Sequence, residues 1–141
     1  MAFDYMGSGG HASASFPPAI FSFDRRRRQF VHANKRFPTF VLSRLKLNLA
    51  DLTRWQQENN SRNDGHPDFK ISDDEVAEVA VRERFLYKVY AGKEREAWKE
   101  FIKDYRTSGG SGYQDQFRDQ FIQEFKKLFR SDLTYRSIYG S

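Results

Sequence analysis

The sequence of 141 residues contains no cysteine. This absence excludes disulfide bonds, metal sites with thiolate ligands and catalysis by a cysteine nucleophile. Histidine is scarce too, because only His11, His32 and His66 occur, at positions far apart in the chain. Zinc and iron sites need such ligands close together on a rigid element, so the sequence predicts neither a metal site nor a metal cofactor.

The motifs of common enzyme classes are also missing. No Gly-x-Ser-x-Gly nucleophile motif is present, and neither GSGG nor SGGSG continues into the Gly-Lys-Ser/Thr of a phosphate-binding loop. The acids at positions 73–75 lack the alternating ligands and the glycine of a calcium loop. We therefore expect a protein that is not an enzyme, with no catalytic residue and no cofactor.

Long apolar runs are absent as well. No stretch approaches the roughly 18 consecutive apolar residues of a membrane-spanning helix, and Asp4 together with the Gly-Ser run does not fit a secretory signal. A mitochondrial presequence is an alternative, since residues 5–36 hold serines, arginines and one acid, but the arginines cluster instead of recurring around a helix. The sequence therefore predicts a soluble intracellular protein that is not secreted, with its compartment left open.

Aromatic residues and locally concentrated positive charge are what the sequence has in abundance. Phe, Tyr and Trp number 14, 7 and 2, and the net charge is +5. Residues 1–50 carry +6, residues 51–112 carry −2 and residues 113–141 carry +1. The excess of positive charge therefore belongs to the N-terminal third of the chain.

Residues 1–36 lack helical periodicity, and we predict that they form an extended basic arm. GSGGHASAS is flexible by composition, and Pro17 and Pro18 disfavour a helix. Three apolar side chains would anchor the arm: Phe16, Phe21 and Phe23. A basic and aromatic patch follows, and its candidate binding residues are Arg25, Arg26, Arg27, Arg28, Phe30, Lys35, Arg36 and Phe37.

Residues 37–141 carry helical patterns, so the fold predicted for the chain is mainly α, with a small three- or four-helix domain after the arm. A first helix over 38–59 places six apolar residues on one side: Val41, Leu42, Leu45, Leu49, Leu52 and Trp55. The alternation at 45–49 leaves open a short strand followed by a helix from about residue 50. Ser72 and Glu75 form a capping-box pattern that starts a second helix, and Gly92 either ends it or lies within it.

The C-terminal part carries two further patterns. A helix around 97–105 ends at a Gly/Ser linker, residues 108–112, and a last helix carries four aromatics: Phe117, Phe121, Phe125 and Phe129. That stripe fits a membrane interface or a partner's groove, but acids among its neighbours favour packing inside the protein. We expect the tail from residue 131 to be short extended structure.

Our leading hypothesis is a non-enzymatic structural or accessory subunit of a larger assembly, held by its arm on other protein subunits. The alternative is a protein that binds RNA or single-stranded DNA, because arginine matches phosphate and aromatic rings stack on bases. A nuclear import signal is a third interpretation of four consecutive arginines.

Overall fold

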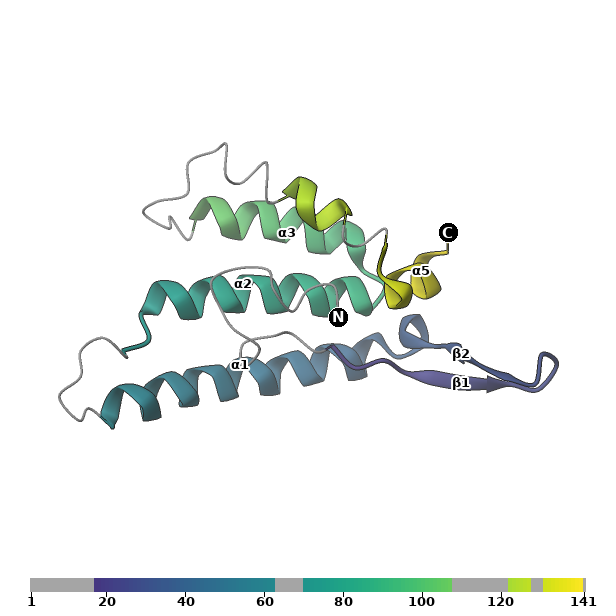
Figure 1. The fold of residues 1–141 in the computed structure, drawn as a ribbon, viewed down its shortest axis with the longest axis horizontal. Helices are drawn as coiled ribbons and strands as arrows, with labels where there is room; N and C mark the ends of the chain where they lie inside the picture. Colours follow the sequence, from purple (N-terminus) through teal and green to yellow (C-terminus); the bar gives the residue numbers. More distant parts are fainter. Residues whose placement is uncertain (1–16, 63–69, 108–121, 128–130, 141) are drawn as a thin grey trace.

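The computed structural model describes residues 17–62, 70–107, 122–127 and 131–140 (Figure 1). Most of these residues are helical, as predicted. The elements in chain order are the strands β1 (Phe21–Asp24) and β2 (Gln29–His32), the 3-10 turn η2 (Asn34–Arg36), and the helices α1 (Pro38–Ser61), α2 (Asp73–Tyr90), α3 (Glu94–Thr107) and α5 (Leu133–Tyr139). Residues 122–127 are helical as well.

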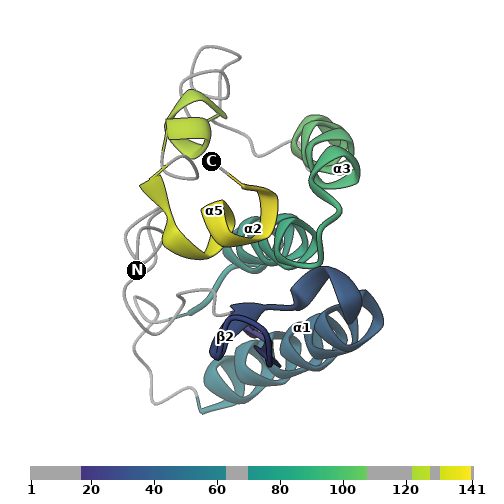
Figure 2. The same cartoon turned by 90° about the vertical axis from the view of Figure 1, so that its right-hand side faces the viewer.

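The three long helices lie side by side and alternate in direction. Figure 2 views them end-on, with α2 between α1 and α3. A helix in that position must bury apolar side chains on two sides, which explains why residues 85–90 at the end of α2 are apolar at every position except Lys88. The hairpin β1–β2 continues past the end of α2 and projects from the helical body (Figure 1).

The core has two parts, one on each side of α2. The larger lies between α2 and α3 and includes Phe85, Leu86 and Phe101. The smaller lies between α1 and α2 and consists of Val41, Leu45, Tyr87 and Ala91, with Ile20, Leu42 and Leu49 packed against it. The amide of Asn48 donates a hydrogen bond to the Tyr87 hydroxyl, so the polar end of this buried tyrosine has a partner.

Helix boundaries follow local signals. Pro38 occupies the first turn of α1, where a backbone N–H would have no hydrogen-bond partner within the helix. The helix α1 is continuous from Pro38 to Ser61, so the alternative of a strand at 45–49 is wrong. Gly92 ends α2 with φ of 81°. The N–H of Lys93 reaches the Lys88 carbonyl, and the N–H of Gly92 reaches the Val89 carbonyl, which together form a Schellman cap.

Two predictions about the core need correction. The tail is helical over α5, because the Asp132 carboxylate accepts the Tyr135 N–H and caps the helix, and because Ile138 is buried against the α2–α3 core. Trp55 is exposed and does not belong to the core face of α1. It lies at the edge of that row, where the helical rotation carries it away from α2.

The last predicted helix is described only at residues 122–127, which are helical. Phe125 is fully buried, and its ring centroid lies 5.2 Å from that of Phe85 and 5.8 Å from that of Phe101. Packing inside the protein is therefore confirmed for Phe125. Phe117, Phe121, Phe129 and the linker 108–112 lie outside the described residues.

Candidate functional site

The hairpin carries most of the residues that the sequence singled out, and its register decides which of them meet. Phe21 pairs with His32 and Phe23 pairs with Phe30 in an antiparallel ladder. Paired residues, and residues two apart on one strand, project from the same face of a sheet. These four rings therefore share one face, whereas Ser22 lies on the other.

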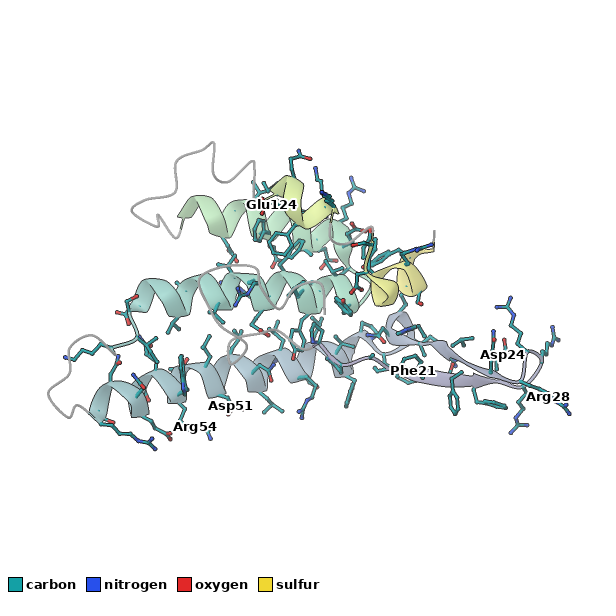
Figure 3. All side chains as sticks on the ribbon, in the orientation of Figure 1. Phe21, Asp24, Arg28, Asp51, Arg54 and Glu124 are labelled. Carbon is teal, nitrogen blue, oxygen red and sulfur yellow. The ribbon has the colours of Figure 1, made fainter. Side chains whose placement is uncertain are left out.

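A turn of four arginines, residues 25–28, closes the hairpin at its outer end. The Asp24 carboxylate accepts the backbone N–H groups of Arg26 and Arg27 at 2.9 and 3.1 Å, so the side chain before the turn shapes it. Arg28 completes the reversal with φ of 50°, a left-handed conformation unusual for a residue with a Cβ. All four arginine side chains are exposed, and Figure 3 places Asp24 and Arg28 at the outer end of the hairpin.

The aromatic face is largely open to solvent. Phe21, Phe23 and Phe30 are exposed to 52%, 54% and 71%. The rings contact each other in pairs, with centroids 5.3 Å apart for Phe23 and Phe30 and 4.3 Å apart for Phe21 and His32. Ring packing across the strands stabilises the hairpin, but more than half of each phenylalanine stays exposed.

The base of the hairpin is fixed to the helical body by Asn34, which is 1% exposed. Its carboxamide oxygen accepts the Ile20 N–H at 2.7 Å, and its NH₂ group donates to the Pro18 carbonyl at 2.8 Å. Ile20 packs against the α1–α2 core. One side chain thus joins the segment that leads into the hairpin to the turn that follows it.

The structure divides the predicted patch into two places. Lys35, Arg36 and Phe37 lie at the base, about 14 Å from the arginine turn if a strand of four residues advances about 3.4 Å per residue. Lys35 is turned onto the body, with its Nζ 4.8 Å from the centre of the Tyr139 ring. The predicted anchor Phe16 lies outside the described residues.

Sequence reasoning missed the outer face of α1. Among the described residues, seven large apolar side chains are exposed, and all belong to the hairpin, the turn after it or α1: Phe21, Phe23, Phe30, Phe37, Phe40, Leu47 and Trp55. The same segment, residues 17–62, carries ten basic and three acidic residues, whereas residues 70–107 carry nine of each. Exposed apolar surface and excess positive charge therefore coincide in one layer of the molecule. Phe40 and Leu47 are seven residues apart, a spacing that places both on the same face of a helix. This spacing is the sequence signal that indicates an apolar outer face on α1.

His32, at the base of the hairpin, has a shifted pKa. Burial lowers the pKa of this histidine below its usual 6.5, and the nearby Asp132 carboxylate opposes that shift by attracting the charged form. Asp132 also accepts a hydrogen bond from the Tyr90 hydroxyl at 3.0 Å. Because β2 packs against α5, Asp132 at the start of α5 is close enough to His32 to act on its pKa.

The described residues offer no arrangement for metal chemistry, because no group of three or more His, Asp or Glu side chains among them is placed to hold an ion. No helix in the described part of the chain is both long and apolar enough to cross a membrane. The chemistry that the hairpin does offer is a ring face for contact and guanidinium groups for anions.

No protein-family model matches this chain, and comparison with curated proteins and with solved structures gave no significant match.

Proposed function

We propose that this protein is a non-enzymatic structural or accessory subunit of a larger macromolecular assembly, held against neighbouring subunits by its N-terminal arm. The observation that carries the proposal is the exposed ring face of Phe21, Phe23 and Phe30 on a projecting hairpin. Such a face costs solubility in a monomer and is typical of a surface that a partner covers.

The composition of the exposed layer supports a protein partner. Aromatic residues and arginine are enriched in the central parts of protein interfaces, and here three phenyl rings adjoin four arginines. The outer face of α1 adds Phe40, Leu47 and Trp55 to the exposed surface. An α-helix that packs on α2 with one face and shows large apolar side chains on another is suited to lie between two neighbours.

The test isolates the tagged full-length chain from its own cells under native conditions and measures the size of the particle that contains it. We expect a particle much larger than the 16.7 kDa chain. The triple variant Phe21→Thr, Phe23→Thr, Phe30→Thr should release the chain, since threonine keeps strand propensity but removes the rings. The matched control replaces exposed residues on α3, Arg95→Ser and Lys99→Ser, and should stay in the particle. A wild-type chain that is a monodisperse monomer with a protected arm contradicts the proposal.

The alternative function is binding of RNA or single-stranded DNA, and the arginine turn beside exposed rings favours it. Guanidinium groups pair with phosphates and rings stack on bases. Four phosphate contacts predict a log–log dependence of affinity on salt with a slope of about −3 for a single strand. Replacing Arg25 to Arg28 with alanine should remove most of that slope.

The control for this experiment removes the same charge from elsewhere on the molecule. Arg95, Lys99, Lys127 and Arg136 are exposed on the body, and their combined replacement by alanine should leave the slope nearly unchanged. Equal losses in the two quadruple variants would mean that net charge, and not the hairpin, attracts nucleic acid. Affinity that does not change with salt excludes this alternative.

A further inference from the structure

The backbone of the hairpin has an open edge, which follows from its hydrogen-bond register. Ala33 donates its N–H to the Ile20 carbonyl at 2.8 Å, and the Ile20 N–H bonds to the Asn34 side chain, so this pair occupies a hydrogen-bonded position of the ladder through one bond. Hydrogen-bonded and non-hydrogen-bonded pairs alternate along an antiparallel ladder. Phe21 and Phe23 are therefore in non-hydrogen-bonded pairs, and their N–H and C=O groups point away from β2 toward the outer edge of β1.

Among the described residues, β2 is the only element with extensive contact to β1. β2 is the strand in contact with α5, whereas β1 has its main contacts with β2 alone. No backbone hydrogen bond from outside the hairpin reaches Phe21 or Phe23 among the described residues. A sheet of two strands is only marginally stable in water, and an open edge without lysine or proline is a template for another strand.

We propose that the outer edge of β1 accepts a β-strand from a partner subunit, so that the hairpin becomes the edge of a larger sheet. This inference rests on the proposed function and specifies how the partner is held. Main-chain hydrogen bonds to Phe21 and Phe23 provide the attachment, and alternate side chains of the added strand cover the ring face.

Charge complementarity describes the added strand further. Asp24 is the one acid at the tip, and its carboxylate already holds the turn through Arg26 and Arg27. Within the described residues, the single ion pair of the four arginines is the 3.8 Å contact of Arg27 with Asp24, and Arg27 is highly exposed. The partner strand therefore has apolar residues at alternate positions and carboxylates at the end that meets the arginine turn. A second copy of this chain brings the same positive layer, with ten basic residues and three acids in 17–62, and fits less well.

The first test is hydrogen–deuterium exchange resolved to single residues, on the purified full-length chain and on the native assembly isolated through it. The Phe21 and Phe23 amides should exchange rapidly in the free chain and about tenfold or more slowly in the assembly, because they gain hydrogen-bond partners there. The Ser22 amide points toward β2 and should be protected in both samples, which makes it the internal reference. If the assembly is recovered and the two outward amides stay unprotected, strand addition is wrong while the proposed function stands. If no assembly is recovered, the proposed function fails and this inference fails with it.

A nucleic acid or a second copy of this chain on the outer edge of β1 would each give a different result in the exchange experiment. Protection that disappears after nuclease digestion identifies a nucleic acid and overturns the inference. Protection that is already present in the purified chain and rises with its concentration identifies a second copy and overturns it too.

A pair of variants at one position separates the backbone from the ring. Phe23→Pro removes the outward N–H and leaves the hairpin ladder intact, whereas Phe23→Ala removes the ring and keeps the N–H. We expect the proline variant to lose assembly about tenfold more than the alanine variant, the effect of roughly one hydrogen bond. Equal losses overturn the inference, because the ring alone would then matter. Retained protection of the Ser22 and Val31 amides shows that the variants still form the hairpin, and the exchange test on the wild type does not depend on them.

Discussion

The carboxamide of Asn34 and the backbone of Ile20 are joined by a hydrogen bond of 2.7 Å, between residues fourteen positions apart. The contact is partly buried, and the same side chain also donates to the Pro18 carbonyl. A second asparagine repeats the arrangement at the other end of α1, where Asn60 accepts the Ile71 N–H and donates to its carbonyl, both at 3.0 Å. Asparagine side chains thus fix both segments that adjoin α1.

Replacing Asn34 by alanine should free the base of the hairpin. The change removes two partly buried hydrogen bonds, those to the Ile20 N–H and the Pro18 carbonyl, which at about 0.5–1.5 kcal/mol each contribute about 1–3 kcal/mol together. We expect the free energy of unfolding to fall by that amount in urea titrations. Amide exchange should accelerate in β1 and β2 more than in α2 and α3. The control is Asn48→Ala, which removes a hydrogen bond to Tyr87 at a site away from the hairpin. Uniform acceleration in the Asn34 variant would contradict the anchoring role.

Gly92 is a second position where the local backbone conformation requires a particular residue. Its φ is 81°, and a Cβ added there would lie 2.6 Å from Cγ of Lys35. The left-handed conformation costs an alanine about 1–2 kcal/mol, and the steric contact adds to that cost. Gly92→Ala should therefore lower the free energy of unfolding by more than about 1 kcal/mol, as measured in urea.

The control for this prediction removes the steric contact and keeps the backbone unchanged. In the background of Lys35→Ala, the effect of Gly92→Ala should shrink toward the conformational cost of about 1–2 kcal/mol alone, because Cγ of Lys35 is gone. An unchanged effect of Gly92→Ala in that background would show that Lys35 is irrelevant.

The long helices could be predicted because their signals are local. Helical spacing of apolar residues and the glycine at position 92 suffice to outline α1, α2 and α3, since each helix buries a face that its own sequence displays. The exposed position of Trp55 could not be read in the same way. An apolar residue at the edge of an apolar stripe can be either buried or exposed, and the position of α2 decides which of the two it is.

Helix α5 was missed for a different reason. Tyr135, Ile138 and Tyr139 have the i, i+3, i+4 spacing of a helix, and Asp132 is a good N-cap, so a signal was present. Seven residues are too few to form a stable helix alone. The tertiary contacts make up the difference, because the Tyr139 hydroxyl donates to the Val89 carbonyl and Tyr135 donates to Glu94.

The sequence of the turn between β1 and β2, residues 25–28, lacks the residues that usually indicate a hairpin. Hairpin turns generally carry Gly or Asn at positions with positive φ, whereas this turn consists of four arginines. Asp24 supplies the missing turn signal through its two backbone hydrogen bonds, and Arg28 adopts the left-handed conformation itself. The sequence therefore predicts an extended segment where two paired strands occur, and it gives no sign of the ring face that they form.

Phe125 and Phe30 illustrate how differently two phenylalanines should behave. Phe125 is fully buried against Phe85 and Phe101, so Phe125→Ala should lower the free energy of unfolding by about 3–5 kcal/mol through lost burial and a cavity. Phe30→Ala removes an exposed ring and should change it by less than about 1 kcal/mol. Equilibrium unfolding of both variants in urea measures the difference. A large loss for Phe30→Ala would mean that its ring belongs to the fold and not to an interface.

His32 makes the stability of the protein depend on pH in a definite direction. Burial lowers its pKa in the folded protein, against the opposing pull of Asp132, so below about pH 6.5 the unfolded chain binds its proton more readily than the folded chain does. The contribution of His32 to the free energy of unfolding is therefore undiminished above about pH 6.5 and decreases as the pH falls from there through the lowered pKa. His32→Gln cannot titrate, and urea unfolding at about pH 7.5 and about pH 5.5 should show a smaller loss on acidification in the variant than in the wild type. Carboxylates that titrate in the same range are common to both proteins, so the difference between the two losses belongs to His32. A wild-type His32 pKa at or above 6.5 by NMR, or equal losses in the two proteins, would show that burial does not lower the pKa of this ring.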